Sequence, residues 1–387
     1  MRVRPFYIVI VALVVVFLAA CGQMGDRYGS TSGTPANGSA PWYKIDLDLD
    51  KDLVQSYVLY GDATHYLNEP CYLRADGKYF LFYEVDEIDL DTDIIHDSYI
   101  MAAASDDGVD WHLLNNHLPV LKAEEAWETG GVGAPSVSWE DSRFVMYYAG
   151  GASTGIGRAT SDNGMVWTKS DSNPLLVPNQ VWEGGEEGVV GAPSVLHHDG
   201  RYRMYYSGGV VDGPDLARRI GYAIGYAESD DGLDFVKRDV SGRDSIHDGA
   251  SVEPIFRATQ EWEFYADELG LVASPEVRVD RPVDRDVYRL YYTGNLVGDF
   301  ILHDVGIGTA ASFDGLEWEK ATDFANPIVN ERFPLTLFGA SQYITYGEFA
   351  PSVIKKGNSY RMVFGQTDLV ESNQGIGLAV HPRPDSL

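Results

Sequence analysis

One unit of sequence recurs five times along this 387-residue chain, and this repetition constrains the fold more than any other feature. Each unit has a Pro-containing segment, a segment ending in paired aromatic or apolar residues, and an Ile-Gly-x-Ala segment or a close variant. The first four units continue into a Gly-containing turn that precedes an aromatic residue. Repeats of this kind are typical of architectures in which each unit packs against the next. The Pro-containing segments begin at Glu69, Ala134, Ala192, Ser274 and Ala350.

The parts of each unit are predicted to be β-strands. Tyr, Val, Phe, Ile and Met dominate them, and turn residues separate them. Asp-Gly ahead of an aromatic residue indicates a hairpin, and no segment shows a convincing helical periodicity. Four short strands per unit, at spacings of about 55–85 residues, fit propeller blades better than a solenoid. The sequence therefore predicts an all-β fold, a five-bladed β-propeller of four-stranded antiparallel blades.

The fifth unit ends after its Ile-Gly-x-Ala segment and lacks a fourth strand. An apolar, β-prone segment at residues 53–60 precedes the first unit and has no partner there. We expect this N-terminal segment to complete the fifth blade, because closing the ring protects two open sheet edges. The repeated aromatic residues are interpreted as packing between blades, as for Tyr148, Tyr206 and Tyr292.

The N-terminus has the features of an export signal. Arg2 and Arg4 precede an almost wholly apolar run, residues 6–20, which ends in Leu-Ala-Ala before Cys21. The run is short for a membrane span, and no basic cluster follows it. Leu-Ala-Ala-Cys resembles the bacterial lipobox, in which the cysteine becomes the lipidated N-terminus. We expect residues 1–20 to be a signal peptide and Cys21 to carry acyl chains.

The segment after Cys21 is rich in Gly, Ser, Thr, Pro and Asn up to residue 41. Such a composition cannot bury a core, so residues 21–41 are predicted to be a flexible tether and residues 42–387 the propeller domain. Gly22 rather than Asp after the cysteine resembles outer-membrane sorting. These features predict a monomer in the cell envelope, attached to the outer membrane through its lipid anchor only, on either the periplasmic or the surface face.

Charge and cysteine content limit the partners. The formal charge of −29 argues against binding nucleic acid or anionic lipid, and is compatible with neutral sugars or cations. With Cys21 lipidated, Cys71 has no partner for an internal disulfide, and its apolar context suggests a small buried hydrophobe. Residues Asp299, His303 and Asp304 lack specific ligand spacing, so neither a metal nor another cofactor is predicted.

Phrases such as Gly-Ala-Pro-Ser-Val, Arg-Tyr-Arg-Met-Tyr-Tyr-Ser-Gly and Ile-Gly-Tyr-Ala-Glu-Ser-Asp-Asp-Gly mark the third unit and recur in variants in the others. On these phrases and the blade count, residues 68–382 resemble the five-bladed glycoside hydrolases of the arabinanase, levansucrase and invertase superfamily. Sialidases are an alternative, since Ser-x-Asp-Gly-x-x-Trp is similar to their Asp box. That box has one more residue between Asp and Gly, and sialidases have six blades.

The resemblance implies catalytic carboxylates on the inner strands of the first three blades. One carboxyl must protonate the leaving oxygen, and a second, ionised, must activate water or attack directly. Glu69 occupies the acidic position before Pro in the first blade. The matching position in the second blade is Ala134, and in the third blade Glu187 lies slightly upstream of the inner strand. Glu69 and Glu187 are therefore the catalytic candidates.

Further acidic and aromatic residues flank the Pro-containing segments. Glu276 follows the Pro of the fourth segment, and Glu348 precedes the fifth segment; both are candidates for binding substrate. Three tryptophans, each followed by Glu, precede inner strands by a short loop and could stack on a sugar ring. They are Trp127, Trp182 and Trp262. Their recurrence across blades equally suggests a structural role.

Two functions stay open. In the first, the protein hydrolyses glycosidic bonds of extracellular polysaccharides or oligosaccharides by carboxylate acid/base catalysis. In the second, it is a non-catalytic propeller that binds a glycan or an envelope partner, as the missing carboxylate at Ala134 suggests. Two or more carboxylates converging in the central funnel would favour the enzyme.

Overall fold

The structure is a computed structural model. It describes residues 43–44, 57–62, 64–89, 94–211, 220–245, 251–265, 269–281, 285–294, 305–321, 329–330, 345–357, 359–368 and 374–381. All of these belong to one compact unit, residues 41–384. The predicted signal peptide and the whole predicted tether, Cys21 included, lie outside the described residues. Within the described part, no helix is long and apolar enough to cross a bilayer.

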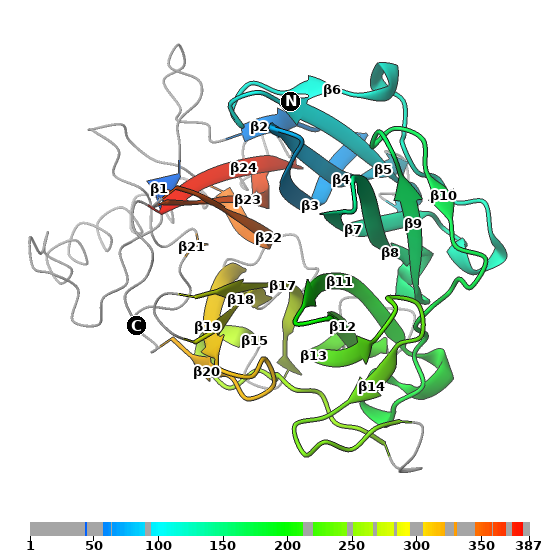
Figure 1. Ribbon diagram of the computed structural model, residues 1–387, viewed down its shortest axis with the longest axis vertical. Helices are drawn as coiled ribbons and strands as arrows, with labels where there is room; N and C mark the ends of the chain where they lie inside the picture. The colour runs from blue at the N-terminus through cyan, green and yellow to red at the C-terminus, as the bar shows by residue number, and fades with distance from the viewer. Residues whose placement is uncertain are drawn as a thin grey trace, which may run out of the picture. The chain divides into compact units, whose positions relative to one another are not determined.

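The described residues form a five-bladed β-propeller, as predicted (Figure 1). Each blade is an antiparallel sheet whose first strand lies innermost. Blade 1 contains β3 (His65–Ala75), β4 (Lys78–Asp89), β5 (Ile94–Ser105) and β6 (His112–Leu113). Blade 2 contains β7 (Val132–Glu140), β8 (Arg143–Gly150), β9 (Ile156–Ser161) and β10 (Thr168–Lys169). Blade 3 contains β11 (Val189–His198), β12 (Arg201–Val211), β13 (Ile220–Ser229) and β14 (Val236–Arg238).

The last two blades follow the same order. Blade 4 contains β17 (Val272–Asp280), β18 (Val287–Gly294), β19 (Gly306–Ser312) and β20 (Glu319–Lys320), with β21 (Val329–Asn330) also on β19. Blade 5 contains β22 (Thr345–Lys356), β23 (Ser359–Asp368) and β24 (Gln374–His381). A separate pair, β15 (Phe264–Tyr265) and β16 (Leu269–Gly270), precedes β17. Short 3-10 helices occupy loops: η1 (Asn115–His117), η2 (Ala126–Glu128), η3 (Gly151–Ser153), η4 (Val181–Glu183), η5 (Gly185–Glu187) and η6 (Glu261–Glu263).

The N-terminal segment closes the ring. Both β1 (Tyr43–Lys44) and β2 (Tyr57–Tyr60) pair antiparallel with the outer edge of β24, β1 near its end and β2 near its start. The prediction that the N-terminal segment completes the fifth blade is confirmed for residues 57–60, while residues 53–56 lie outside the described residues; β1 extends the closure. The outer edge of β24 is therefore paired within the chain rather than left open.

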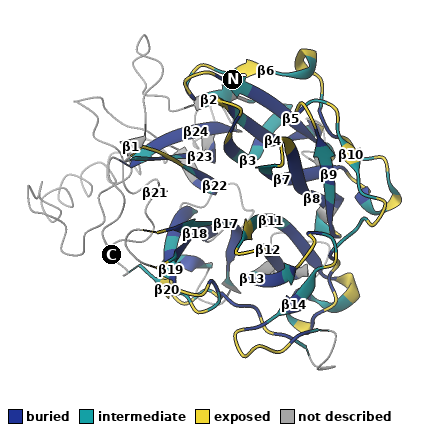
Figure 2. Cartoon of the chain, viewed as in Figure 1, coloured by how far each residue is buried: buried dark blue, intermediate teal, exposed yellow. Residues whose placement is uncertain are grey.

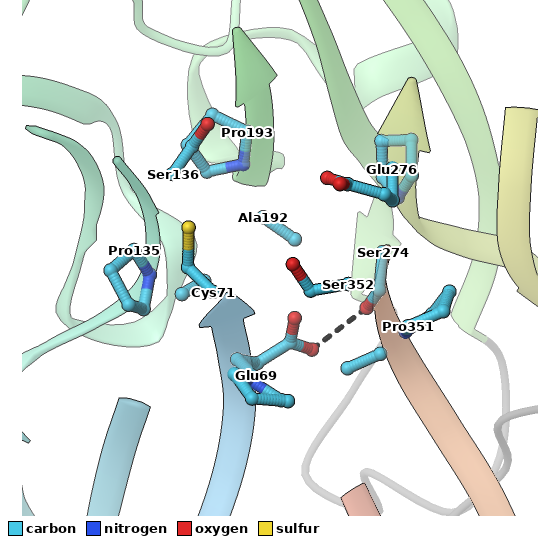
Figure 3. Close-up of a pocket in the computed structure, with 14 residues that line it drawn as sticks. Glu69, Cys71, Pro135, Ser136, Ala192, Pro193, Ser274, Glu276, Pro351 and Ser352 are labelled. Carbon is cyan, nitrogen blue, oxygen red and sulfur yellow. Dashed lines mark hydrogen bonds between the residues drawn. The ribbon is translucent and has the colours of Figure 1, made fainter. Parts of the chain in front are cut away.

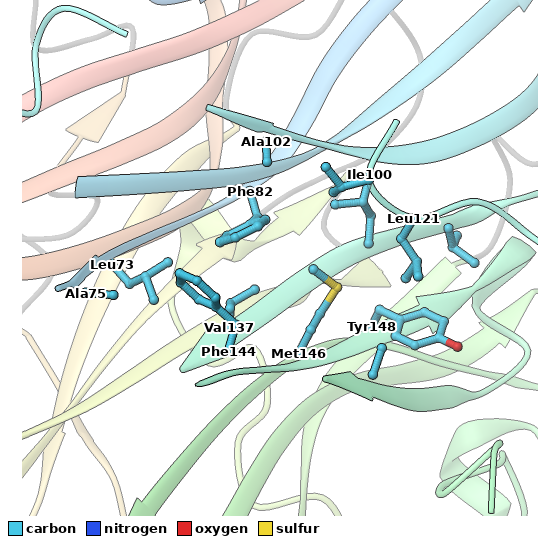
Figure 4. Packing of buried hydrophobic residues seen from close by; sticks show 13 residues of the cluster. Leu73, Ala75, Phe82, Ile100, Ala102, Leu121, Val137, Phe144, Met146 and Tyr148 are labelled. Carbon is cyan, nitrogen blue, oxygen red and sulfur yellow. The ribbon is translucent and has the colours of Figure 1, made fainter. Parts of the chain in front are cut away.

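The core lies between the blades, where the broad faces of neighbouring sheets meet (Figure 2). Between blades 1 and 2, for example, Phe82 and Ile100 pack against Phe144 and Met146 (Figure 4). The paired aromatic residues of the second strands are among the largest fully buried side chains, including Tyr148, Tyr206 and Tyr292. Their predicted role in packing is confirmed.

Every inner strand bulges at its Pro. The residue before the Pro adopts a left-handed backbone conformation in all five blades, with φ of 41° at Glu69, 45° at Ala134, 42° at Ala192, 45° at Ser274 and 49° at Ala350. A non-Gly residue at positive φ is strained, and its recurrence shows that the bulge is built into the repeat. The bulge places the residue before each Pro against the central channel and, in every blade except blade 3, the residue after it as well.

Candidate active site

The five bulges narrow the central channel to a small throat (Figure 3). The space enclosed there is about 30 Å³, enough for roughly two water molecules and too small for a sugar ring. The throat is lined by Glu69–Cys71, Ala134–Ser136, Ala192–Pro193, Ser274–Glu276 and Ala350–Ser352.

The residues after the five prolines form a ring of hydrogen bonds between blades. In each blade the backbone N–H two positions after the Pro donates to the side chain after the Pro of the preceding blade, over 2.9–3.3 Å. The acceptors are Cys71, Ser136, Ser194, Glu276 and Ser352. The ring explains the repeated Pro-Ser. It also gives Glu276 and Cys71 a structural role in place of serine.

Glu69 points from blade 1 across the channel toward blade 4, which is not its neighbour in the ring (Figure 3). The Ser274 hydroxyl donates a hydrogen bond to its carboxylate over 2.7 Å. Burial raises the pKa of Glu69 to about 7, the Ser274 hydrogen bond opposes the shift, and the Asp86 charge adds to it. A carboxyl that titrates near neutrality can act as a general acid or base.

Two more carboxyl groups, Glu84 and Asp86, lie on β4 beside the first inner strand. The backbone N–H of Ala134 in blade 2 donates to Glu84 Oε2 over 2.8 Å. Asp86 is only 5% exposed and accepts hydrogen bonds from Asn68 Nδ2, over 2.6 Å, and from the Ser98 hydroxyl, over 2.5 Å. Glu84 as a whole residue is half-buried, whereas Asp86 is buried.

The three carboxyl groups interact electrostatically. Burial raises the pKa of Glu84 well above its ordinary value, and the charges of Asp86 and Glu69 raise it further. Burial also raises the pKa of Asp86, while hydrogen bonds from Ser98, Glu84 and Asn68 oppose that rise. Two neighbouring carboxyls that cannot both ionise share a proton. Glu84 is the donor of the pair and Asp86 the acceptor.

Of the sequence candidates, Glu69 and Glu276 line the throat, and Glu187 does not. Glu187 ends η5 ahead of β11 and is exposed. Glu348 is fully buried in β22, opposite Gln366 of β23. The assignment of these residues to catalysis or substrate binding stays a prediction.

The three tryptophans belong to a unit that recurs ahead of the inner strands. In each copy the Trp lies beside a second-strand Tyr, with ring centroids 5.7–6.1 Å apart. The following Glu is fully buried and accepts hydrogen bonds from two backbone N–H groups, the Tyr hydroxyl and a fourth-strand Lys. The sets are Trp127, Glu128, Tyr148 and Lys169; Trp182, Glu183, Tyr206 and Lys237; and Trp262, Glu263, Tyr292 and Lys320. Each Trp is half-buried and has this structural role; stacking on a sugar stays a prediction.

One group among the described residues has the geometry for a shared ion: His198, Asp199 and Asp286. It lies between blades 3 and 4, where His198 bonds Asp286 over 2.8 Å and its ring packs edge-on against Tyr288. Arg281 also donates to Asp286. These contacts account for the group as an ion-pair network between blades. Asp299, His303 and Asp304 lie outside the described residues.

The sequence analysis missed Glu84 and Asp86. In the sequence, the two residues mark a departure from the repeat. Residues 82–86 of blade 1 read Phe-Tyr-Glu-Val-Asp, whereas the matching residues of blades 2 and 3 read Tyr-Tyr-Ala-Gly-Gly and Tyr-Tyr-Ser-Gly-Gly. The register places Glu84 opposite Asn68, as Ala149 is opposite Gly133 and Ser207 opposite Gly191. Comparing the repeats position by position would have identified both carboxylates.

Comparison with known proteins agrees with this fold. No family model and no curated protein matches the sequence. Solved structures similar to it include a thermostable family-43 glycoside hydrolase, with 18% identity over 82% of this chain and 90% of that chain and a TM-score of 0.56. Another, with 14% identity over 90% and 95% of the two chains and a TM-score of 0.57, comes from work on GH130-family hydrolases that target β-1,2 mannosidic linkages in Candida mannan. A third is BT0996 in a complex with RGII, with 17% identity over 89% and 92% and a TM-score of 0.57. The protein thus has the five-bladed propeller fold seen in glycoside hydrolases.

Proposed function

We propose that the protein hydrolyses glycosidic bonds of extracellular polysaccharides or oligosaccharides, with Glu69 as one of its catalytic carboxylates. The observation that carries the proposal is a group of three interacting carboxyls: Glu69 lines the throat of the propeller channel, and Glu84 and Asp86 lie beside it on β4. Burial and mutual repulsion keep part of this group protonated near neutral pH, and acid/base cleavage of a glycosidic bond needs one protonated and one ionised carboxyl. The similar folds of glycoside hydrolases support the choice of substrate class.

We also propose that the enzyme works in the cell envelope as an outer-membrane lipoprotein attached through Cys21. The support is the lipobox-like Leu-Ala-Ala-Cys and the Gly/Ser/Pro-rich segment that follows it. Labelling of expressing cells with a palmitate analogue should mark the wild-type protein and not Cys21→Ala. Equal labelling of both forms would reject the anchor without affecting the proposed activity.

A glycan screen tests the activity. The domain from Trp42 onward should release reducing sugar from at least one member of a panel of plant and microbial poly- and oligosaccharides. Glu69→Gln keeps the size of the side chain but cannot ionise, and it should lower kcat at least ~100-fold on the same substrate. A wild-type domain that binds a glycan without cleaving any panel member would instead support the non-catalytic binding propeller.

A further inference from the structure

The proposed hydrolysis needs a second carboxyl besides Glu69, and the structure offers a candidate outside the inner strands. Glu84 lies on the second strand of blade 1, and its Oε2 accepts the N–H of Ala134 in blade 2. The same bond between blades recurs elsewhere with a hydroxyl acceptor: Ser274 N–H donates to Ser207, and Ala350 N–H donates to Thr293. A serine or threonine would therefore be sufficient for the structural bond.

The space around Glu84 is shaped for a carboxyl. Gly133 lies directly against it, and a Cβ at that position would overlap both carboxyl oxygens. Asp86, two residues along the strand, stands where blades 2 and 3 have Gly151 and Gly209. Blade 1 thus carries a carboxyl pair at positions where blades 2 and 3 carry small residues, and Gly133 of blade 2 leaves room for the Glu84 carboxyl.

The two carboxyls of the pair have different surroundings. Asp86 is buried and held by Asn68 and Ser98, two donors that stabilise its ionised form. Glu84 accepts a single backbone N–H, and the residue as a whole is less buried than Asp86. Because more donors stabilise the ionised form of Asp86, the proton shared by the pair belongs on Glu84.

We propose that Glu84 is the general acid of this site and that Asp86 is the residue that positions it and keeps its proton in place. This assignment rests on the proposed glycoside hydrolysis. In the reaction, the bond between the anomeric carbon and the leaving oxygen breaks, and the proton of Glu84 passes to that oxygen. Water gives one proton to the Glu69 carboxylate and bonds to the anomeric carbon. Exchange with solvent then returns the proton from Glu69 and reprotonates Glu84, so that one water is consumed per bond.

Leaving-group dependence separates an acid from a structural carboxylate, because a leaving group that departs as a stable anion needs no proton. On the saccharide identified by the glycan screen, Glu84→Gln should lower kcat/KM by about 10²–10⁴-fold. On the 2,4-dinitrophenyl glycoside of the same sugar, the loss should be less than about 10-fold. Glu69→Gln should be slow on both substrates. The fall of kcat/KM at alkaline pH, which is the alkaline limb of its pH profile, should disappear in Glu84→Gln.

Asp86→Asn tests the positioning role. Removing the neighbouring charge makes Glu84 easier to ionise, so the alkaline limb of kcat/KM should move to lower pH while part of the rate remains. Thr293→Val is the matched control, because it removes the same kind of bond between blades, far from the carboxyl group, and should leave the profile unchanged.

The outcomes are distinguishable. If the wild-type domain cleaves the substrate and Glu84→Gln keeps its rate, its leaving-group dependence and its alkaline limb, the assignment of Glu84 is overturned while the proposed function stands. If Glu84→Gln is equally slow on both substrates and Thr293→Val behaves like it, Glu84 is structural. If the wild-type domain cleaves no glycoside, both the function and the assignment fail.

Discussion

At the residue scale, Gly133 lies directly against the Glu84 carboxyl, so a methyl group added at Gly133 would displace that carboxyl. Gly133 does not have a positive φ, so its backbone conformation would not strain an alanine, and the nearest atoms to the added Cβ all belong to Glu84. We expect Gly133→Ala to pull Glu84 away from Ala134 and to lower hydrolysis at least ~10-fold. The free energy of unfolding should fall by about 1–3 kcal/mol. Steady-state kinetics and urea denaturation measure the two effects.

Gly191 supplies the control, because it occupies the matching position in blade 3. A Cβ there would meet Ser153 and Ala149 rather than a carboxyl. Gly191→Ala should lower stability comparably and leave kcat unchanged. An equal loss of activity in both variants would show that Gly133 acts through the fold and not through Glu84.

Single residues were also the hardest to predict from the sequence. Glu69 was predictable because the adjacent Pro marks its position in a repeat. Glu276 was noticed for the same reason, although its role as an acceptor in the ring between blades depends on a neighbouring blade 77 residues away. Glu84 and Asp86 lie two strand positions apart with no Pro beside them, and only the register with β3 shows that they approach Glu69.

At the element scale, the loops that carry Trp127, Trp182 and Trp262 are each fixed by a buried Glu–Lys pair. Lys237 is 3% exposed and contacts Glu183, which is fully buried, over 2.6 Å. Removing one partner of a buried pair leaves the other charge uncompensated. We expect Lys237→Met to lower the free energy of unfolding by about 3–5 kcal/mol, measured by urea denaturation.

An exposed pair is the comparison. Lys122 is 54% exposed and lies 3.8 Å from Asp97, so Lys122→Met should change stability by less than about 1 kcal/mol. Similar losses in the two variants would mean that the Glu183 pair contributes no more than a surface contact. The sequence did show the recurring Trp-Glu, but the Lys lies 41 to 57 residues later on another strand, which local patterns do not connect.

At the scale of the whole molecule, ring closure depends on the N-terminal strands. The side chains of Val58 and Leu59 pack onto the core between blades 5 and 1, and β1 and β2 cover the edge of β24. Deleting residues 1–60 should lower the free energy of unfolding by about 2–4 kcal/mol and promote aggregation through the exposed edge. Deleting residues 1–41 leaves both strands in place and should have neither effect. Thermal unfolding and light scattering of the two truncated proteins make the comparison.

The channel carboxyls should also make stability fall as pH rises. Burial raises the pKa of both Glu69 and Glu276 to about 7 from an ordinary value of 4.5. Below pH 4.5 both groups are protonated in the folded and unfolded chain. Between pH 4.5 and 7 the unfolded chain loses these protons while the folded chain keeps them, so the free energy of unfolding decreases over this window and then levels off. The expected fall is on the order of 1–3 kcal/mol for each carboxyl.

Repulsion within a chain of net charge −29 would give a fall of the same sign, so the test needs two matched variants. Glu276→Gln keeps an oxygen to accept the Val353 N–H and removes the titrating group from the throat. Glu317→Gln removes an equal charge from an exposed position. Urea denaturation between pH 4.5 and 8 should show a shallower fall for Glu276→Gln than for wild type, and an almost unchanged fall for Glu317→Gln. Equal slopes in the two variants would assign the pH dependence to overall charge rather than to the throat, because Glu276 is the member of the pair whose burial raises its pKa in the folded chain.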